Sequence, residues 1–321
     1  MVPAVYLVIP CYNEEKVLPE TVKRLTEKLG SMIGSGLVSK KSRMLFVDDG
    51  SRDGTWKLIS GSCDENELVR GIRLAHNRGH QNALLAGLMT AREFADCAVS
   101  LDADLQDDVD ALDRFVTKFQ EGCDVVYGVR SKRETDSFFK RTTARGFYRF
   151  MELLGVDLVY DHADYRLMSR RALDALSEYR ETNLFLRGLV PLIGYRSDYV
   201  TYDRHERFAG ESKYPLKKMI AFAVEGVTSF SVKPLKLIFH LGGAVSLVSL
   251  VGVIWSLVSH FHGGAAPWVP AVWSLWLLGG ILLLCLGTIG TYIGKIYGEV
   301  KARPRYKIEE FKKGPSGKEN S

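Results

Sequence analysis

The sequence has 321 residues, of which 46% are hydrophobic, and it carries a formal net charge of +5. Basic residues are interleaved with acidic ones rather than gathered in one stripe, which argues against a nucleic-acid-binding protein. Charged residues are absent between Lys236 and Lys295 and frequent on either side. This distribution predicts a soluble domain, an apolar segment and a polar tail.

The first two thirds of the sequence alternate between strand-like and helix-like segments. Helical patterns over 81–94 and 109–120 lie between short apolar runs that we interpret as strands. These runs cover residues 5–9, 44–47, 69–74, 98–101 and 124–129. The alternation predicts an α/β domain over residues 1–213, with a mainly parallel sheet covered by helices on both faces.

Polar side chains follow several of these strands, at Glu14, Asp49 and Arg130 among other positions. Ligands of parallel sheets bind beyond the carboxyl ends of the strands, so these groups are expected at one edge. Asp102, Ala103 and Asp104, here called the acidic turn, follow the fourth strand. Two carboxylates separated by one small residue suit Mg²⁺ or Mn²⁺, which would neutralise a diphosphate leaving group.

Gln106 could add an amide oxygen to that metal site. Aspartates also cap helices and stabilise turns, so the acidic turn alone is weak evidence, strengthened by its place after an apolar strand. The sequence contains no other complete motif for binding a metal or a nucleotide. The segment 48–54 resembles the start of a calcium-binding loop, but Ser60 stands where that loop needs Glu. No phosphate-binding loop or dinucleotide fingerprint is present.

The five cysteines form no CxxC pair, which predicts free, buried thiols in a reducing compartment. The segments 237–261 and 268–293 contain no Asp, Glu, Lys or Arg. Each is longer than the roughly 20 apolar residues that span a bilayer as a helix. We therefore predict transmembrane helices over 235–261 and 268–294, in preference to a buried core hairpin.

Lysine and arginine flank this predicted hairpin on its outer sides, and the connecting loop has none. The positive-inside rule then places the predicted α/β domain, both termini and the polar tail over 295–321 in the cytosol. The segment 214–234 has apolar residues at helical spacing beside Lys217 and Lys218. It is expected to form an amphipathic helix, either on the membrane surface or packed against the domain.

Six motifs occur in order along the chain, and the last of them lies just before the apolar segment. They are VIPCYNEE at 8–15, VDDGSRDGT at 47–55, NRGHQ at 77–81, LDADLQD at 101–107, YRLMSR at 165–170 and RFAGESK at 207–213. Together they resemble glycosyltransferase family 2, in particular the branch that glycosylates polyprenyl phosphates, such as dolichol-phosphate mannose synthases and bacterial undecaprenyl-phosphate glucosyltransferases. The resemblance covers nearly the whole chain, including the hairpin.

The sequence departs mildly from that family. Asp108 stands where proline is common, and Ala163 and Tyr165 stand where glycine and phenylalanine are common. Neither change removes a residue expected to bind a ligand.

The resemblance implies a GT-A fold and assigns roles to individual residues. It places the base and ribose of the donor at Pro10, Tyr12, Glu14, Val47 and Asp49. It places the metal and diphosphate at Asp102, Ala103, Asp104 and Gln106. Phosphates of donor or acceptor are expected at Arg130, Arg207 and Lys213, with Arg141 a weaker candidate for the lipid phosphate. Guanidinium and ammonium groups suit phosphate oxygens.

Asp104, Arg130 and Asp164 are the implied catalytic residues. Asp164 would orient the acceptor or accept a residual proton, although pairing with Arg166 or capping a helix explains it equally well. The expected reaction is inverting transfer of a sugar from a nucleotide diphosphate, preferably a UDP-linked glucose or N-acetylglucosamine, to a polyprenyl phosphate such as undecaprenyl phosphate. The expected location is the bacterial inner membrane.

Three other functions remain open at this stage. A processive polysaccharide synthase would need a QxxRW motif and more membrane spans, and the sequence has neither. A catalytically silent membrane scaffold would have no need of the acidic turn and the phosphate-binding cations. A soluble nucleotidyltransferase is disfavoured by the hairpin. Membrane hairpins often pack together, so a homo-oligomer is compatible with the sequence.

Overall fold

The computed structural model describes residues 2–130, 162–181, 186–203 and 268–315, together with residues 238, 240, 244, 247, 248 and 251. The described residues belong to two compact units. The first unit comprises those up to 130, those from 162 to 203, and those from 303 to 315. The second comprises those between 238 and 302, and each unit is considered by itself below.

One sheet forms the centre of the first unit, and its described strands follow the order β7-β5-β6-β4-β1-β2-β3-β8. The strands are β1 (Val5–Cys11), β2 (Arg43–Asp48), β3 (Val69–Leu74), β4 (Cys97–Ser100), β5 (Val125–Arg130), β6 (His162–Ser169), β7 (Ser197–Tyr202) and β8 (Ile308–Lys312). The five predicted strands are confirmed as β1 to β5. Strands β6, β7 and β8 were not predicted.

The sheet is mainly parallel, as predicted, but β6 and β8, which the sequence did not predict, run antiparallel to their neighbours. Strands β4, β1, β2 and β3 run parallel to one another, and β5 runs parallel to β7. Strand β6 is antiparallel to both β4 and β5, and β8 is antiparallel to β3. Strands β1, β2 and β4 are near-continuous apolar runs, as a parallel sheet requires when both faces are covered. The antiparallel strands lie outside this group and carry more polar residues.

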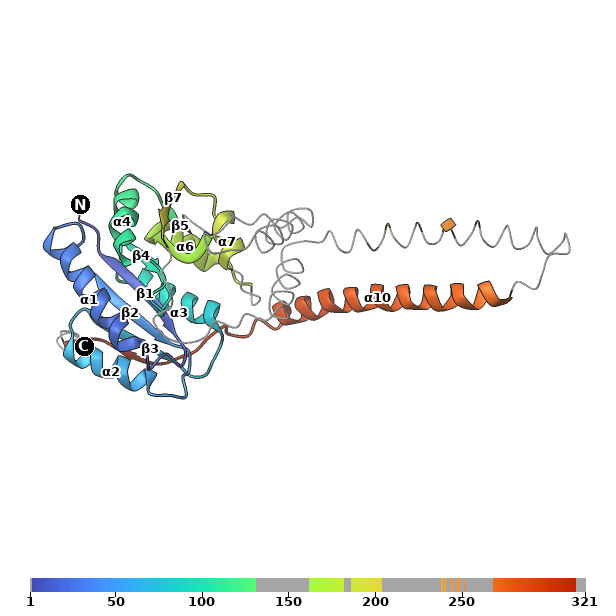
Figure 1. Cartoon of the computed structure of the whole chain (residues 1–321), viewed down its shortest axis with the longest axis horizontal. Helices are drawn as coiled ribbons and strands as arrows, with labels where there is room; N and C mark the ends of the chain where they lie inside the picture. Colours follow the sequence, from blue (N-terminus) through green and yellow to red (C-terminus); the bar gives the residue numbers. More distant parts are fainter. Residues whose placement is uncertain are drawn as a thin grey trace. The chain divides into compact units, whose positions relative to one another are not determined.

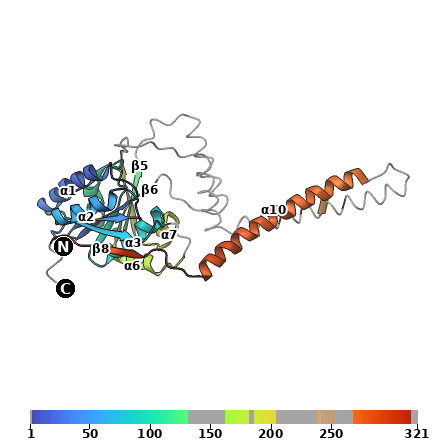
Figure 2. The same ribbon diagram turned by 90° about the horizontal axis from the view of Figure 1, so that it is seen from below.

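Helices cover both faces of the sheet (Figures 1 and 2). They are α1 (Leu18–Gly34), α2 (Thr55–Glu65), α3 (His80–Arg92), η1 (Val109–Ala111), α4 (Leu112–Gln120), α6 (Arg170–Glu178) and α7 (Leu186–Leu192). Val5, Leu7 and Ile9 of β1 form one core cluster with apolar residues of α1, α2 and α4. Because neighbouring residues of a strand point to opposite faces, Val8 faces α3 instead. The helix α3 therefore covers the other face.

Gly87 lets α3 approach the sheet closely. A Cβ atom at this position would lie 2.4 Å from Cγ1 of Val8 and 2.7 Å from Cγ2 of Val47. Both distances are too short for carbon atoms, so any side chain here would displace the helix. The small residue therefore fixes the height of α3 over β1 and β2. It thereby also fixes the position of the N-terminal residue of α3, His80.

The strand directions bring the predicted polar groups to one edge of the sheet. Strands β1, β2 and β4 all end there, as the pairing of Cys11 with Asp48 and of Val8 with Ser100 indicates. Strand β6 runs the opposite way and pairs Arg166 with Ser100, so its first residues lie opposite the turn that follows β4. Strands β5 and β7 end at the same edge. The antiparallel β6 thus places Asp164 across from Asp102.

Strand β8 makes the chain beyond residue 302 part of the sheet rather than the plain polar tail that the sequence predicted. It pairs with β3, and the backbone N–H of Ala75 donates to the carbonyl of Lys307. Lys312 donates to Ser60 at 2.8 Å and forms an ion pair with Asp64, both on α2. The strand was missed because three of its five residues are charged, a composition that suits an edge strand.

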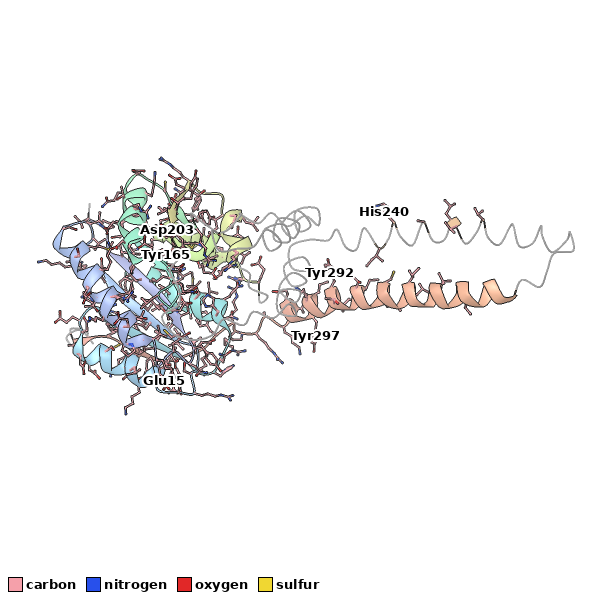
Figure 3. All side chains as sticks on the ribbon, viewed as in Figure 1. Glu15, Tyr165, Asp203, His240, Tyr292 and Tyr297 are labelled. Atoms are coloured by element: carbon pink, nitrogen blue, oxygen red, sulfur yellow. The ribbon has the colours of Figure 1, made fainter. Side chains whose placement is uncertain are left out.

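The second unit contains one long described helix, α10 (Trp268–Val300), so the second predicted apolar segment is helical. Figure 3 shows Tyr292 and Tyr297 on its last turns. Within the part of the chain that the structure describes, no helix meets the combined length and hydropathy required of a membrane span. The segment 214–234 and most of 235–261 lie outside the described residues, so the amphipathic helix and the hairpin stay predictions.

Candidate active site

The acidic turn follows β4 and is hydrogen-bonded to the first turn of α1. The hydroxyl of Thr21, in the first turn of α1, donates to the carbonyl of Ala103 at 2.8 Å. The backbone N–H of Gln106 donates to Oδ1 of Asp104 at 3.2 Å. Leu105 adopts a left-handed backbone with φ of 56°, which costs about 1 kcal/mol for a residue with a Cβ. Such strain at a polar turn is typical of functional sites.

His80 lies between the acidic turn and β6. Its Nε2 is 3.9 Å from Oδ1 of Asp102 and 3.5 Å from Oδ2 of Asp164. Partial burial lowers the pKa of His80, but the hydrogen bond to Asp164 and the charge of Asp102 outweigh it, so the pKa lies above its ordinary value. A protonated imidazole can therefore bridge the two carboxylates. The sequence prediction quoted His80 within a motif but gave it no role.

Asp164 is surrounded by cationic side chains. Arg187 contacts both of its oxygens, at 3.1 Å from Nε and 3.1 Å from Nη2, and Nη2 of Arg166 lies 3.6 Å away. Burial raises the pKa of Asp164, but His80 and the two arginines together hold it well below the usual range. The pairing of Asp164 with Arg166 that the sequence left open is present, and Arg187 adds a closer contact. Asp164 is thus a permanent negative charge at neutral pH.

Asp102 has the opposite electrostatic environment. Burial is the main cause that raises its pKa to about 6; His80 opposes this, and the charges of Asp107, Asp164 and Asp104 add to it. The carboxylates gathered at this edge of the sheet therefore repel one another in the absence of a cation. A divalent cation would relieve this repulsion, since it favours the ionised form of the acid.

The residues of the acidic turn fit a hard divalent cation. Asp102 and Asp104 supply two carboxylates, the ligand type that Mg²⁺ and Mn²⁺ prefer. Among the described residues, no three His, Cys, Asp or Glu side chains gather as metal ligands. A metal bound here would therefore complete its coordination with water and substrate phosphate, as Mg²⁺ commonly does. Whether the side-chain amide of Gln106 takes part stays a prediction.

Asp49 organises the loop that carries His80. Its Oδ1 accepts the backbone N–H of Arg78 at 2.7 Å, and its Oδ2 accepts that of Gly79 at 2.9 Å. Gly50 makes this approach possible, since a Cβ atom there would lie 2.7 Å from the backbone nitrogen of Asn77. The sequence predicted contacts of Asp49 with base or ribose. The structure gives its carboxylate this second role, and the nucleotide contact stays a prediction.

The other residues predicted for the base and ribose lie at the ends of β1 and β2, next to Asp49. Pro10 and Val47 are buried within paired strands and face each other in register. Glu14 follows β1, and its backbone N–H donates to Oγ1 of Thr55 at 2.9 Å. Tyr12 is 43% exposed, which leaves its ring accessible to a planar ligand such as a base. These four residues share one edge with the acidic turn.

Arg130 ends β5 and forms a hydrogen bond with Tyr202 at the end of β7. Tyr202 in turn donates to Oδ1 of Asp107 at 2.7 Å. Tyr165, which Figure 3 labels within the sheet unit, donates to the carbonyl of Asp108 at 3.0 Å. The structure thus ties Arg130 to the segment after the acidic turn. Its predicted contact with phosphate is untested.

Three predicted phosphate-binding residues, Arg141, Arg207 and Lys213, lie outside the described residues. Three residues that shape the site carried no role in the sequence prediction: His80, Arg187 and Tyr202. His80 lies in the NRGHQ motif and could have been inferred from its place at the start of a predicted helix. Arg187 and Tyr202 lie in no motif, and only the three-dimensional structure brings them to Asp164 and Asp107.

Comparison with known proteins gives a consistent result. The family model described as glycosyl transferase family 2 matches residues 6–177. An uncharacterized glycosyltransferase of Bacillus subtilis, YkoT, is 51% identical over 308 residues, which cover 96% of this chain and 91% of the relative. The bactoprenol glucosyl transferase of Shigella phage SfX is 35% identical over 312 residues, which cover 95% of this chain and 99% of the relative.

A prophage bactoprenol glucosyl transferase homolog of Escherichia coli is 34% identical over 313 residues, covering 96% of this chain and 99% of the relative. Among solved structures, the mannosyltransferase PcManGT of Pyrobaculum calidifontis, in complex with GDP-Man and Mn²⁺, is similar with a TM-score of 0.49 and 17% identity. That similarity covers 94% of this chain and 86% of the other.

Proposed function

The chain belongs to glycosyl transferase family 2, and we propose that this glycosyltransferase moves a hexose from a nucleoside diphosphate to a polyprenyl phosphate. The observation that carries the proposal is the full-length similarity to proteins named bactoprenol glucosyl transferase, at 34–35% identity. The mixed sheet, with its acidic turn at the edge, agrees with the GT-A fold expected for this family. UDP-glucose and UDP-N-acetylglucosamine are the preferred donors, and undecaprenyl phosphate is the preferred acceptor.

In this reaction, an oxygen of the lipid phosphate attacks the anomeric carbon of the sugar. The bond between that carbon and the diphosphate breaks, and the nucleoside diphosphate leaves with the electron pair, so the configuration inverts. A phosphate monoester has its second pKa near ~6, so the attacking oxygen is already ionised at neutral pH. Catalysis then depends mainly on positioning and on charge neutralisation rather than on a strong base.

The residues of the site divide these tasks. Asp102 and Asp104 would hold Mg²⁺ or Mn²⁺, which when bound neutralises the charge of the diphosphate. Asp164 is suited to orient the acceptor rather than to take up a proton, because a carboxylate whose pKa lies well below the usual range accepts a proton poorly. This favours the orienting role of Asp164 over its alternative role as a base. Arg130 is proposed to bind phosphate.

A polyprenyl acceptor requires the site to work close to a membrane. We retain the hairpin over 235–261 and 268–294 as part of the proposal, with the sheet unit on the cytoplasmic side of a bacterial inner membrane. Its support is the absence of charge in both segments and the lysine and arginine residues that flank them. Fractionation of cells that produce the full chain tests this part: recovery in the soluble fraction would contradict it.

The reaction is tested with the purified full-length chain, Mn²⁺ or Mg²⁺, undecaprenyl phosphate and radiolabelled UDP-glucose, UDP-N-acetylglucosamine or GDP-mannose. Label that enters the organic phase from one donor identifies both reaction and sugar. Asp102→Asn and Asp104→Asn should each abolish transfer. Asp110→Asn is the matched control, since the Asp110 side chain is 85% exposed and pairs with Lys28 away from the acidic turn.

Three outcomes would contradict the proposal. Failure of every donor to label the lipid would contradict the polyprenyl acceptor, and wild-type activity in both acidic-turn variants would contradict the metal site. Formation of a labelled polymer in place of a single lipid-linked sugar would favour the processive synthase. A catalytically silent scaffold would bind neither donor nor metal, which equilibrium dialysis with labelled UDP-glucose and Mn²⁺ would reveal.

A further inference from the structure

Arg187 forms a bidentate ion pair, here called the fork, with the carboxylate of Asp164. Its Nε lies 3.1 Å from Oδ1 and its Nη2 lies 3.1 Å from Oδ2, so each carboxylate oxygen has its own donor. Such a bidentate pair fixes both the position and the rotation of a carboxylate, whereas a single hydrogen bond leaves rotation free. The pair joins β6 to α7 across 23 positions of sequence. Arg187 therefore determines the plane in which the Asp164 carboxylate lies.

The backbone next to Arg187 is itself fixed on both sides. The N–H of Leu186 donates to Oε1 of Gln81 at 2.8 Å, and the carbonyl of Leu186 accepts from Nη1 of Arg166 at 3.4 Å. The side chain of Leu186 is only 2% exposed, and those of Leu189 and Val190 are equally buried on the inner side of α7. The backbone at the start of α7 is therefore held in place, so a side chain that it carries can position another group.

These contacts connect Arg187 to the acidic turn through neighbouring residues of α3. Gln81 holds the start of α7, and His80, immediately before it, lies between Asp102 and Asp164. The hydroxyl of Ser100, the last residue of β4, donates to the backbone carbonyl of Asp164. Asp164 is thus held at its backbone by the strand that precedes the acidic turn and at its carboxylate by Arg187.

We infer that Arg187 is a positioning residue for glycosyl transfer, which acts by locking the Asp164 carboxylate toward the bound substrates. This inference rests on the proposed function, in which Asp164 orients a substrate group. Without the fork, the carboxylate can rotate about its Cβ–Cγ bond, and among the described residues it keeps His80 and the more distant Arg166 as charged partners. Misorientation of this kind lowers the rate of the chemical step more than it lowers substrate binding.

The first test measures kcat and the KM for the nucleotide sugar in the full-length Arg187→Ala variant. Loss of a residue that orients a functional group typically costs about 10- to 100-fold in activity. We expect a loss of this size in kcat, with KM changed less than about threefold. Arg187→Lys should retain intermediate activity, because lysine supplies charge without the fork. Guanidinium chloride added at millimolar concentration should partly restore Arg187→Ala and leave the wild type unchanged.

A double-mutant comparison shows whether Arg187 acts through Asp164. In the Asp164→Asn background, Arg187→Ala should cause little further loss, because the group that it positions has already been altered. If Arg187→Ala costs the same factor in both backgrounds, Arg187 acts independently of Asp164 and the inference is wrong. Arg92→Ala, which removes a single ion pair of 3.7 Å with Asp174 between α3 and α6, is the control and should keep wild-type activity.

The positioning role of Arg187 and the role of Asp164 in transfer can be tested separately. If Asp164→Asn is inactive while Arg187→Ala has wild-type kcat, only the positioning role is overturned. If Asp164→Asn transfers sugar at the wild-type rate, the role of Asp164 in the proposed function is overturned first. A loss of activity in Arg187→Ala that guanidinium does not restore, and that accompanies a lower melting temperature, would mean that Arg187 stabilises the fold and would also overturn the inference.

Discussion

Tyr202 and Asp107 form a buried hydrogen bond of 2.7 Å that ties the end of β7 to the segment after the acidic turn. The two residues are 2% and 7% exposed, so water does not readily replace the contact. Tyr202→Phe removes the donor and leaves the ring in place. We expect the free energy of unfolding to fall by about 1–3 kcal/mol, the usual cost when a buried acceptor loses its donor.

Thermal melting of the purified variant measures this effect. Tyr199→Phe is the matched control, because Tyr199 lies on the same strand but its side chain is 63% exposed. If the melting temperature falls equally in both variants, the loss does not come from the hydrogen bond to Asp107, and the prediction is wrong. The binding of Mn²⁺ should also weaken in Tyr202→Phe, since Asp107 follows the acidic turn closely in sequence.

Gly87 offers a test of how closely α3 packs on the sheet. Gly87→Ala places a methyl group against Val8 and Val47, and we expect a loss of about 1–3 kcal/mol from overpacking. Gly30→Ala in α1 is the control, since nothing lies within 4 Å of the added carbon. That change should stabilise the protein by about 0.5–1 kcal/mol through helix propensity. Equal melting temperatures for the two variants would contradict the close approach of α3.

The pKa of Asp102 predicts an unusual dependence of stability on pH in the metal-free protein. The group titrates at about 6 when folded, against 3.8 for the ordinary value, mainly because of burial. Between these two pH values the folded state binds more protons than the unfolded state, so stability falls as pH rises. A cation bound to the ionised carboxylate reverses this penalty. Mn²⁺ should therefore raise the melting temperature more at pH 7 than at pH 5.

Differential scanning fluorimetry at both pH values, with and without Mn²⁺, measures the difference. Asp102→Asn removes the titrating group, so its stability should change less between pH 4 and pH 6 than that of the wild type. Its response to Mn²⁺ should be small and equal at the two pH values. A wild-type response to Mn²⁺ that does not depend on pH would count against Asp102 as a ligand.

Strand β8 predicts that truncation after residue 302 damages the sheet unit. Such a chain loses the pairing with β3 and the packing of Phe311 on Phe94, whose ring centroids are 6.1 Å apart. Burial of Phe311 alone is worth on the order of 1 kcal/mol, and the exposed edge of β3 would promote aggregation. A chain that ends after Pro315 keeps these contacts and serves as the control. Size-exclusion chromatography and melting temperatures compare the two, and identical behaviour would contradict the prediction.

Local sequence patterns were sufficient to predict the strands in the central part of the sheet. Apolar residues predominate in strands β1 to β5, including β3 despite its two arginines, and their burial leaves a strong signal in the sequence. The same patterns could not reveal β6, in which the charged Asp164 and Arg166 interrupt the apolar residues. Strand β7 alternates between exposed and buried positions, and β8 is mostly charged. These strands exist because of their partners in the sheet, a non-local effect.

The candidate site was predictable to a similar extent. The acidic turn, Asp49 and Arg130 follow predicted strands, so the rule that ligands bind at strand ends placed them at one edge. That rule could not bring Asp164 to Asp102, because this requires the antiparallel direction of β6. Nor could it find Arg187, whose contact with Asp164 depends on how α7 packs. Pairing between distant segments, which no local pattern encodes, supplied these relationships.

Strand β8 also limits the path of the chain between the two parts of the sequence that form the sheet. The described residues up to Asp203 and those from Arg303 onwards belong to the same folded unit, and β8 pairs with β3 inside it. Both ends of the intervening segment must therefore lie on the same side of any membrane. If that segment crosses a bilayer, the number of crossings is even. A single crossing, or three, would require the sheet to lose its edge strand.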